Sequence, residues 1–192
     1  MNFEKIWILF CPALRHASDD LTGELLHKTL ARMRSKSSPG CDGWRVDELK
    51  RLPPVLLDQL ACLFNIIEDT GVWPAALCEG IVSLITKGEG TSPLKLRPIG
   101  VMSVFYRLWA ATRVRQVMDW QETWLDDNLH SFRKAHGAED VWWRQALQVE
   151  EALLHTESLF GLSLDYGKCF DRVPVHIVLQ LALEQGMSPR LV

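Results

Sequence analysis

One run of apolar residues, closed by proline at one end and glycine at the other, constrains the fold of this chain most. The run begins at Pro53–Pro54 and stops at Gly71. Between them apolar residues recur at helical spacing, at Leu56, Leu60, Leu63, Phe64 and Ile67. Proline at the start and glycine just past the end are the expected boundaries of a helix. The pattern predicts a long amphipathic helix that buries its apolar stripe against other elements.

Other segments repeat this helical spacing of apolar residues. They cover about 22–34, 101–120, 139–156 and 174–185, and Gly186 closes the last one. In the second and third, the residues expected to face a core are Val101, Val104, Phe105, Leu108 and Ala111, then Trp142, Ala146, Val149 and Leu153. The chain is therefore predicted to be rich in helix.

Two short segments predict strands, because β-branched or alternating apolar residues fill them. The first, 80–86, leads into a glycine-rich turn and a second extended stretch, in which Pro98 suits a strand edge or end. The other covers 159–165, and its core-facing residues are Phe160, Leu162 and Leu164. Strands placed between helices predict an α/β fold, or a helix-rich α+β fold.

The composition is that of a globular protein and gives no global sign of a partner. The 192 residues are 47% hydrophobic and 23% charged, with a net charge of -3. No apolar run approaches the roughly 18 residues of a spanning helix, so we expect no membrane segment. Five widely spaced cysteines without a CxxC pair predict reduced thiols and no disulfide partner, in an intracellular protein of the nucleus or cytoplasm. The six histidines show no metal-ligand spacing with one another or with cysteine.

Asp165 is the strongest candidate for chemistry. Period-two alternation along the predicted strand puts Gly161, Ser163 and Asp165 on the face opposite the core. Two tiny residues leave that face open, and the carboxylate stands at the carboxyl end of the strand. Such a site suits a hard cation such as Mg²⁺, which takes oxygen ligands and keeps positions free for water and phosphate. The alternative is an aspartate that only caps the following turn.

The residues around Asp165 resemble a known motif. Asp165-x-x-Lys168-Cys169-Phe170-Asp171-x-Val173 is similar to the first catalytic-aspartate motif of reverse transcriptases of the non-LTR (LINE-type) retrotransposon class. Four further segments resemble motifs of that family in the same order: SPGCDG at 38–43, Gly71–Pro74 followed by 81–87, Arg97–Pro98–Ile99, and HSFR at 130–133. The ordered matches cover about 21–192.

The resemblance implies a right-hand polymerase fold, with the fingers and the first strand and helix of the palm. Residues 1–20 would be a poorly ordered N-terminal extension and 21–192 a partial reverse transcriptase domain. Within it, 21–158 would be mainly fingers and 159–192 the start of the palm. The family carries a further metal-binding carboxylate in a later hairpin of [FY]-x-D-D type, which these 192 residues lack. We therefore expect a truncated enzyme that is inactive alone.

The resemblance also implies roles for single residues. Asp165 would hold Mg²⁺, with two ions in the full-length family, and Tyr166 would add its backbone carbonyl for two-metal nucleotidyl transfer. Lys87 and Arg97 would contact the triphosphate from either side of the glycine-rich turn. Phe170 would exclude a ribose 2′-hydroxyl. The implied partners are an RNA template, a DNA primer and deoxynucleoside triphosphates.

The remaining implied roles concern the template, the primer and a turn. Phe132 and Arg133 would support template and primer, and Asp171 would orient the turn near the site. His130 and Ser131 stand where the family has Gln-x-Gly, in the segment that supports the template. Cys41 and Cys169 likewise replace the commoner proline and alanine.

Simpler interpretations stand beside each of these roles. Lys87 and Arg97 are alternatively solvated charges on a hairpin, and Phe170 a core residue. Trp142 fits core packing, whereas an exposed Trp143 would suit base stacking. For the chain as a whole, the alternatives are a non-catalytic nucleic-acid-binding or interaction module derived from a retroelement, and an unrelated helical scaffold.

Overall fold

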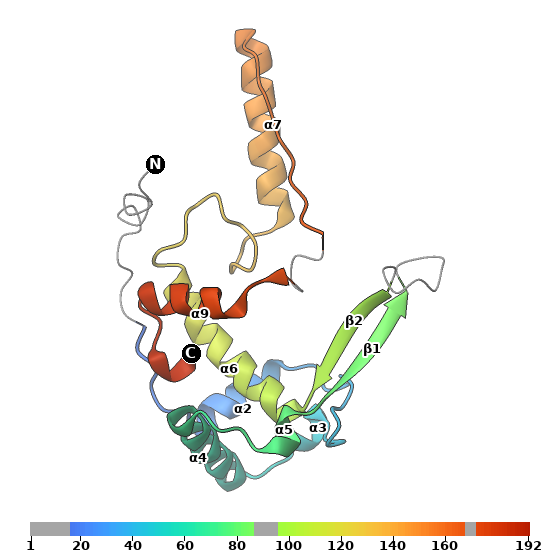
Figure 1. Cartoon of the computed structure of the whole chain (residues 1–192), viewed down its shortest axis with the longest axis vertical. Helices are drawn as coiled ribbons and strands as arrows, with labels where there is room; N and C mark the ends of the chain where they lie inside the picture. Colours follow the sequence, from blue (N-terminus) through green and yellow to red (C-terminus); the bar gives the residue numbers. More distant parts are fainter. Residues whose placement is uncertain (1–15, 87–95, 168–171) are drawn as a thin grey trace. The chain divides into compact units, whose positions relative to one another are not determined.

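A computed structural model of the chain describes residues 16–86, 96–167 and 172–192 (Figure 1). The chain divides into two compact units, which we name the 18–116 unit and the 117–190 unit after the residues that make up most of each. In the described ranges, no helix is both long and apolar enough to cross a bilayer. The thiols of Cys41, Cys62 and Cys78 are free and exposed.

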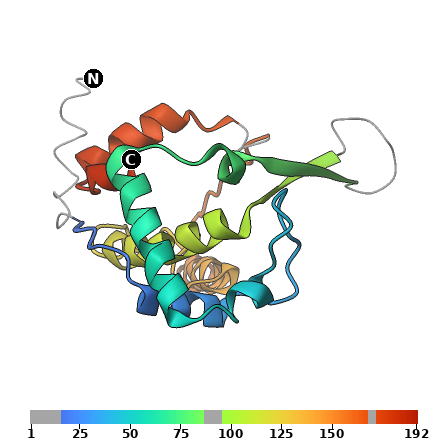
Figure 2. The ribbon, with the colours of Figure 1, turned by 90° about the horizontal axis from the view of Figure 1, so that it is seen from below.

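The 18–116 unit combines helices with one antiparallel hairpin, which extends away from them as a ribbon (Figures 1 and 2). Its elements are α2 (Gly23–Arg32), α3 (Val46–Leu49), α4 (Pro54–Thr70), α5 (Ala75–Cys78), β1 (Gly80–Thr86), β2 (Leu96–Met102) and most of α6 (Val104–Gln121). Helix α2 packs against α4. The core cluster comprises Leu21, Leu26, Leu30, Val46, Leu49, Leu57, Ala61, Phe64, Ile67, Val104 and Leu108.

The predicted end of α4 at Gly71 is confirmed, and a local signal also determines the start of α2. The backbone N–H of Leu25 donates to the Thr22 hydroxyl over 3.2 Å, which caps α2. Gly71 ends α4 in the left-handed conformation at φ 68°. The buried face of α4 matches the predicted stripe at Phe64 and Ile67 but not at Leu56 and Leu63, which are exposed, and it includes Leu57, which the stripe does not. Helix α4 is apolar on more than one face, so spacing alone did not select the buried one.

The predicted hairpin is confirmed, with one shift in its second strand. β1 pairs with β2 in antiparallel register, from Gly80↔Met102 to Thr86↔Leu96. Val101 therefore belongs to β2, and α6 begins three residues later than the start of the predicted helix, at Val104. Val104 and Leu108 are buried, as predicted for the inward face of that helix.

The 117–190 unit contains the end of α6, then α7 (Ala138–His155), α9 (Val175–Glu184) and a 3-10 turn, η2 (Pro189–Leu191). Both helix predictions for this part are confirmed in position. The predicted core stripe of α7 is wrong, because Trp142 and Leu153 are each 74% exposed and Val149 is 46% exposed. Apolar residues at helical spacing indicate a helix face that can pack against a neighbour, but no described element covers this face of α7.

The strand predicted over 159–165 does not form. These residues have no regular secondary structure, and Phe160, Leu162 and Leu164 are 93%, 84% and 70% exposed. A strand needs a neighbour with which to exchange backbone hydrogen bonds. In the described part of the chain, the strand ladder joins β1 only to β2. The observed fold is thus a mixture of helices and a small two-stranded sheet, compatible with the predicted α/β class, while the fingers and palm assignment remains a prediction.

Candidate functional site

Arg97 lies on β2 close to the end of the hairpin. It pairs with Ile85, and the next pair, Thr86↔Leu96, is the last of the described ladder. Both strands are largely solvent-exposed, Arg97 included. The Arg97 side chain therefore does not pack into a core, and its guanidinium is accessible to solvent near the end of the described strand ladder. Lys87, its predicted counterpart, lies outside the described residues.

The 38–43 segment is packed against the residues that follow β2. A Cβ added at Gly40 would lie 2.7 Å from the backbone Cα and N of Ser103, so only glycine allows this approach. The Ser103 hydroxyl donates to the Asp42 carboxylate over 2.5 Å. Arg107 donates to the Ser38 carbonyl oxygen over 2.8 Å. The 38–43 segment thereby contacts the residues that follow β2, in the same unit that carries Arg97.

Asp165 lies in the exposed extended segment of the 117–190 unit. Tyr166, beside it, is 72% exposed. Because the predicted strand is not formed, no sheet holds the carboxylate next to Gly161 and Ser163. Arg97 belongs to the other unit, and Phe170 and Asp171 lie outside the described residues. Metal binding by Asp165 remains a prediction.

Arg133 holds the loop between α6 and α7 together. Its guanidinium forms an ion pair with Glu122 at 2.7 Å and donates to the carbonyl oxygens of Asp126 and Leu129 at 3.0 Å. The Arg133 side chain is only 6% exposed. The neighbouring Phe132 is 77% exposed and adopts φ 60°, in the left-handed region. Of the two predicted template-support residues, Phe132 faces solvent and Arg133 is engaged within the loop.

The Arg133–Glu122 pair makes loop stability depend on pH. The hydrogen bond from Arg133 lowers the pKa of the Glu122 carboxyl below its ordinary 4.5. Because the pKa of Glu122 is lowered in the folded state, the ion pair stabilises the fold fully at pH values above the ordinary pKa. This stabilisation is lost as the pH falls through the lowered pKa. We expect Arg133→Ala to reduce the melting temperature at neutral pH by more than it does in acid.

Melting curves of the chain and of Arg133→Ala, measured from about pH 7 to about pH 3, test this. The matched control is Arg144→Ala, because Arg144 is exposed and donates to the neutral amide of Asn128. An Arg133→Ala deficit that stays constant with pH would contradict the role assigned to Glu122.

Known proteins that are similar to this chain come from transposable elements. No family model matches the chain. Similar curated proteins of Drosophila melanogaster include the probable RNA-directed DNA polymerase from transposon BS, 28% identical over 143 residues, which are 72% of this chain. The putative 115 kDa protein in type-1 retrotransposable element R1DM is 29% identical over 82% of the chain, and the RNA-directed DNA polymerase from mobile element jockey is 25% identical over 80%.

The chain carries a reverse transcriptase-like region. The relatives are proteins of retrotransposons, so the resemblance predicted from the ordered motifs is confirmed at this level. The chain spans only 15 to 17% of the length of these relatives. Activities of a whole element protein are therefore proposals for this chain.

Several basic residues of the reverse transcriptase-like region have structural partners. Arg113 is buried and pairs with Glu68 through two hydrogen bonds of 2.6 and 2.5 Å. Its remaining nitrogen donates to the backbone carbonyl of Asp19 at 2.9 Å. The arginines of α6 thus do not form a single free surface for phosphates, because Arg113 and Arg107 are engaged inside the unit.

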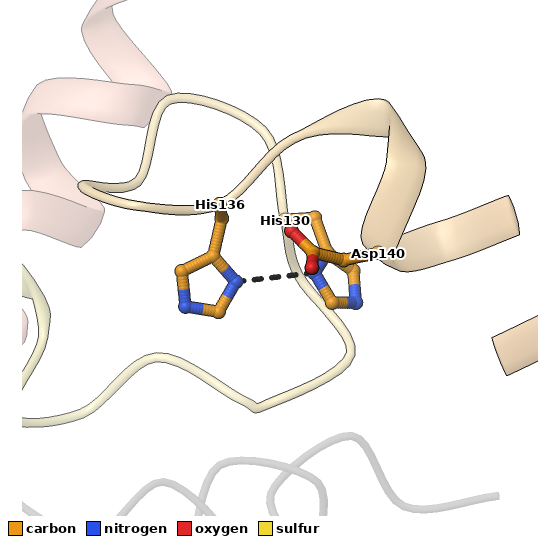
Figure 3. A group of neighbouring side chains, drawn as sticks. All are labelled: His130, His136 and Asp140. Atoms are coloured by element: carbon orange, nitrogen blue, oxygen red, sulfur yellow. Dashed lines mark hydrogen bonds between the residues drawn. The ribbon is translucent and has the colours of Figure 1, made fainter. Parts of the chain in front are cut away.

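The structure also brings together three side chains that the sequence analysis missed (Figure 3). The Nδ1 atoms of His130 and His136 lie 3.1 Å apart, and a carboxylate oxygen of Asp140 lies within 4.8 Å of a ring nitrogen of each histidine. The spacing of the histidines in the sequence does not indicate this group. His130 and His136 are six residues apart on a loop, a spacing that becomes close only through the loop's conformation. Among the described residues, this is the one group of three or more metal-ligating side chains.

Proposed function

We propose that this chain supplies the fingers and the beginning of the palm of a retroelement RNA-directed DNA polymerase. The observation that carries the proposal is similarity to retrotransposon proteins over 72 to 82% of the chain, together with motifs in the family's order. Its substrates would be an RNA template, a DNA primer and deoxynucleoside triphosphates. In that reaction a primer 3′-hydroxyl attacks the α-phosphate of the incoming nucleotide and releases pyrophosphate.

The residues take the following roles in this proposal. Arg97 and Lys87 bind the triphosphate, and the exposed guanidinium of Arg97 on β2 offers a bidentate contact to phosphate oxygens. Asp165 and the Tyr166 carbonyl bind metal, and Phe170 excludes a 2′-hydroxyl. Phe132 and Arg133 shape the loop toward template and primer, and Asp171 orients the turn near the site.

The donor atoms around Asp165 suit Mg²⁺ only in part. Carboxylate and carbonyl oxygens are the ligands this ion prefers. One carboxylate and one carbonyl are too few to hold two ions, and no described group of three metal-ligating side chains includes Asp165. The two-metal chemistry therefore requires at least one more carboxylate than these residues supply. We propose that the 192-residue chain by itself incorporates no nucleotide.

A graft tests the proposal. The matched 158-residue segment of the jockey polymerase would be replaced by this chain, and Mg²⁺-dependent primer extension on an RNA template measured. We expect activity in the graft, none in the isolated chain, and a loss of at least about 100-fold with Asp165→Ala, because a preorganised charge at the reacting phosphate is removed. The control is Glu150→Ala, an exposed carboxylate on α7.

An inactive graft, or equal activity of the Asp165→Ala and Glu150→Ala grafts, would refute the polymerase role. The second candidate function, a non-catalytic nucleic-acid-binding or interaction module, would then be favoured. One observation supports that candidate: Trp142 and Trp143 are 74% and 69% exposed on α7, where their rings are accessible to bases or to a protein partner. It predicts nucleic-acid binding by the isolated chain that Asp165→Ala leaves unchanged.

A further inference from the structure

We propose that His130, His136 and Asp140 form a binding site for a divalent transition-metal ion of the zinc class. All three residues belong to the 117–190 unit, in the loop before α7 and in the first turn of that helix (Figure 3). The site is separate from the proposed magnesium site at Asp165 and does not depend on the polymerase proposal.

The distances fit a metal centre. Each residue offers one ligand atom, and these atoms all lie within 4.8 Å of one another. The two Nδ1 atoms are 3.1 Å apart. Two nitrogen ligands at the usual 2.0–2.1 Å from zinc, separated by a tetrahedral angle, are about 3.3 Å apart. Small rotations of the imidazole rings therefore suffice to place an ion between them.

The local structure holds the ligands in position. His130 is nearly buried, at 9% exposed, whereas His136 is half-buried and directly precedes the N-cap of α7, Gly137. The Asp140 carboxylate accepts a hydrogen bond from the Gly137 backbone N–H at 2.7 Å, which orients it toward the imidazoles. Ligating carboxylates commonly need such a hydrogen bond to fix their orientation. Arg133, which binds loop carbonyls and Glu122, braces the chain between the two histidines.

The donor set selects the class of ion. Two imidazole nitrogens and one carboxylate suit zinc and related transition metals, whereas magnesium and calcium prefer oxygen ligands. Three protein ligands leave a fourth coordination position free for water or an added ligand. A pocket of about 540 Å³, lined by both histidines together with Phe132 and Trp142, adjoins the site and has room for such a ligand.

Zinc binding to the full 192-residue chain tests the proposal. Titration calorimetry with Zn²⁺, and the visible spectrum with Co²⁺ as a probe, would be measured for the chain and for His130→Gln, His136→Gln and Asp140→Asn. We expect the unsubstituted chain to bind one ion. Each ligand substitution should abolish binding, or weaken the affinity by more than the roughly 10- to 100-fold that removal of a ligand's hydrogen-bond partner costs. The Asn at position 140 keeps an oxygen that accepts from Gly137, so the helix cap survives.

Two controls separate the site from other metal-binding groups. His155→Gln changes an exposed histidine in the last turn of α7, and we expect it to leave affinity and stoichiometry unchanged. Proton–nitrogen correlation spectra should show metal-dependent shifts at Nδ1 of His130 and His136, and the Co²⁺ spectrum should lack a thiolate charge-transfer band. Circular dichroism confirms that the variants stay folded. Absence of binding, or binding that His136→Gln leaves intact, would show that the pair is only a hydrogen bond between imidazoles.

Discussion

Replacing Glu68 by alanine should lower the free energy of unfolding of the 18–116 unit by about 3–5 kcal/mol, because it leaves the buried Arg113 guanidinium without its counter-charge. The side chains of Arg113 and Glu68 are 4% and 1% exposed, so water cannot replace the lost partner. Glu68 also accepts a hydrogen bond from the indole N–H of Trp109 at 2.7 Å. The substitution thus leaves three N–H donors, two on Arg113 and one on Trp109, without their acceptor, as well as one charge without its counter-charge.

Equilibrium denaturation of the chain, followed by circular dichroism, measures this loss. The matched control is Gln59→Ala, an exposed substitution on the same helix, which should change stability by about 0.5 kcal/mol or less. A double variant, Glu68→Leu with Arg113→Met, should recover much of the loss, since it removes both charges and refills the volume with apolar atoms. A loss below about 1 kcal/mol for Glu68→Ala would show that the pair is not buried in solution.

Phe64→Ala is expected to have an effect of the same size, about 3–5 kcal/mol, through a cavity in the core. Phe64 is fully buried among the side chains of α2, α3, α4 and α6. Its ring also lies near that of Trp73, with centroids 6.4 Å apart. Truncation removes these contacts and leaves space that the surrounding helices fill only in part.

The adjacent Leu63 is the control for Phe64. It is 38% exposed, and its truncation should cost about 1 kcal/mol or less. The same denaturation measurement compares the two variants. Because both residues belong to the apolar run of α4, the comparison reads out which face of the helix is buried. Equal losses for Leu63→Ala and Phe64→Ala would contradict the orientation of α4 described above.

Elements that depend on local signals were predictable from the sequence. Thr22 caps α2, Gly71 ends α4, and β-branched residues form β1, each through interactions within a few residues. Elements that depend on a partner distant in the sequence were not predictable. The segment around Phe160 has an alternating pattern but no strand beside it, and the stripe of α7 around Trp142 has no packed neighbour, so both apolar patterns remain exposed.

The same distinction between local and distant interactions applies to the residues of the candidate site. The position of Arg97 on a hairpin followed from the residue types of β1 and β2. The approach of Gly40 to Ser103 joins residues far apart in sequence, and spacing gave no sign of it. The pairing of His130 with His136 depends on loop conformations that include a left-handed Phe132 and Ala135. A histidine pair with an aspartate four residues beyond was the available signal, but it matches no common metal-ligand spacing.

The bond from Arg113 to the carbonyl of Asp19 has a consequence for biosynthesis, because its two ends are 94 residues apart along the chain. A ribosome adding about 5–20 residues per second needs about 5–20 s to progress from the first partner to the second. Glu68, on α4, is synthesised 45 residues before Arg113, so in the later part of that interval it is present without its guanidinium. Nascent polypeptide of this length should therefore remain a client for chaperones until α6 leaves the exit tunnel.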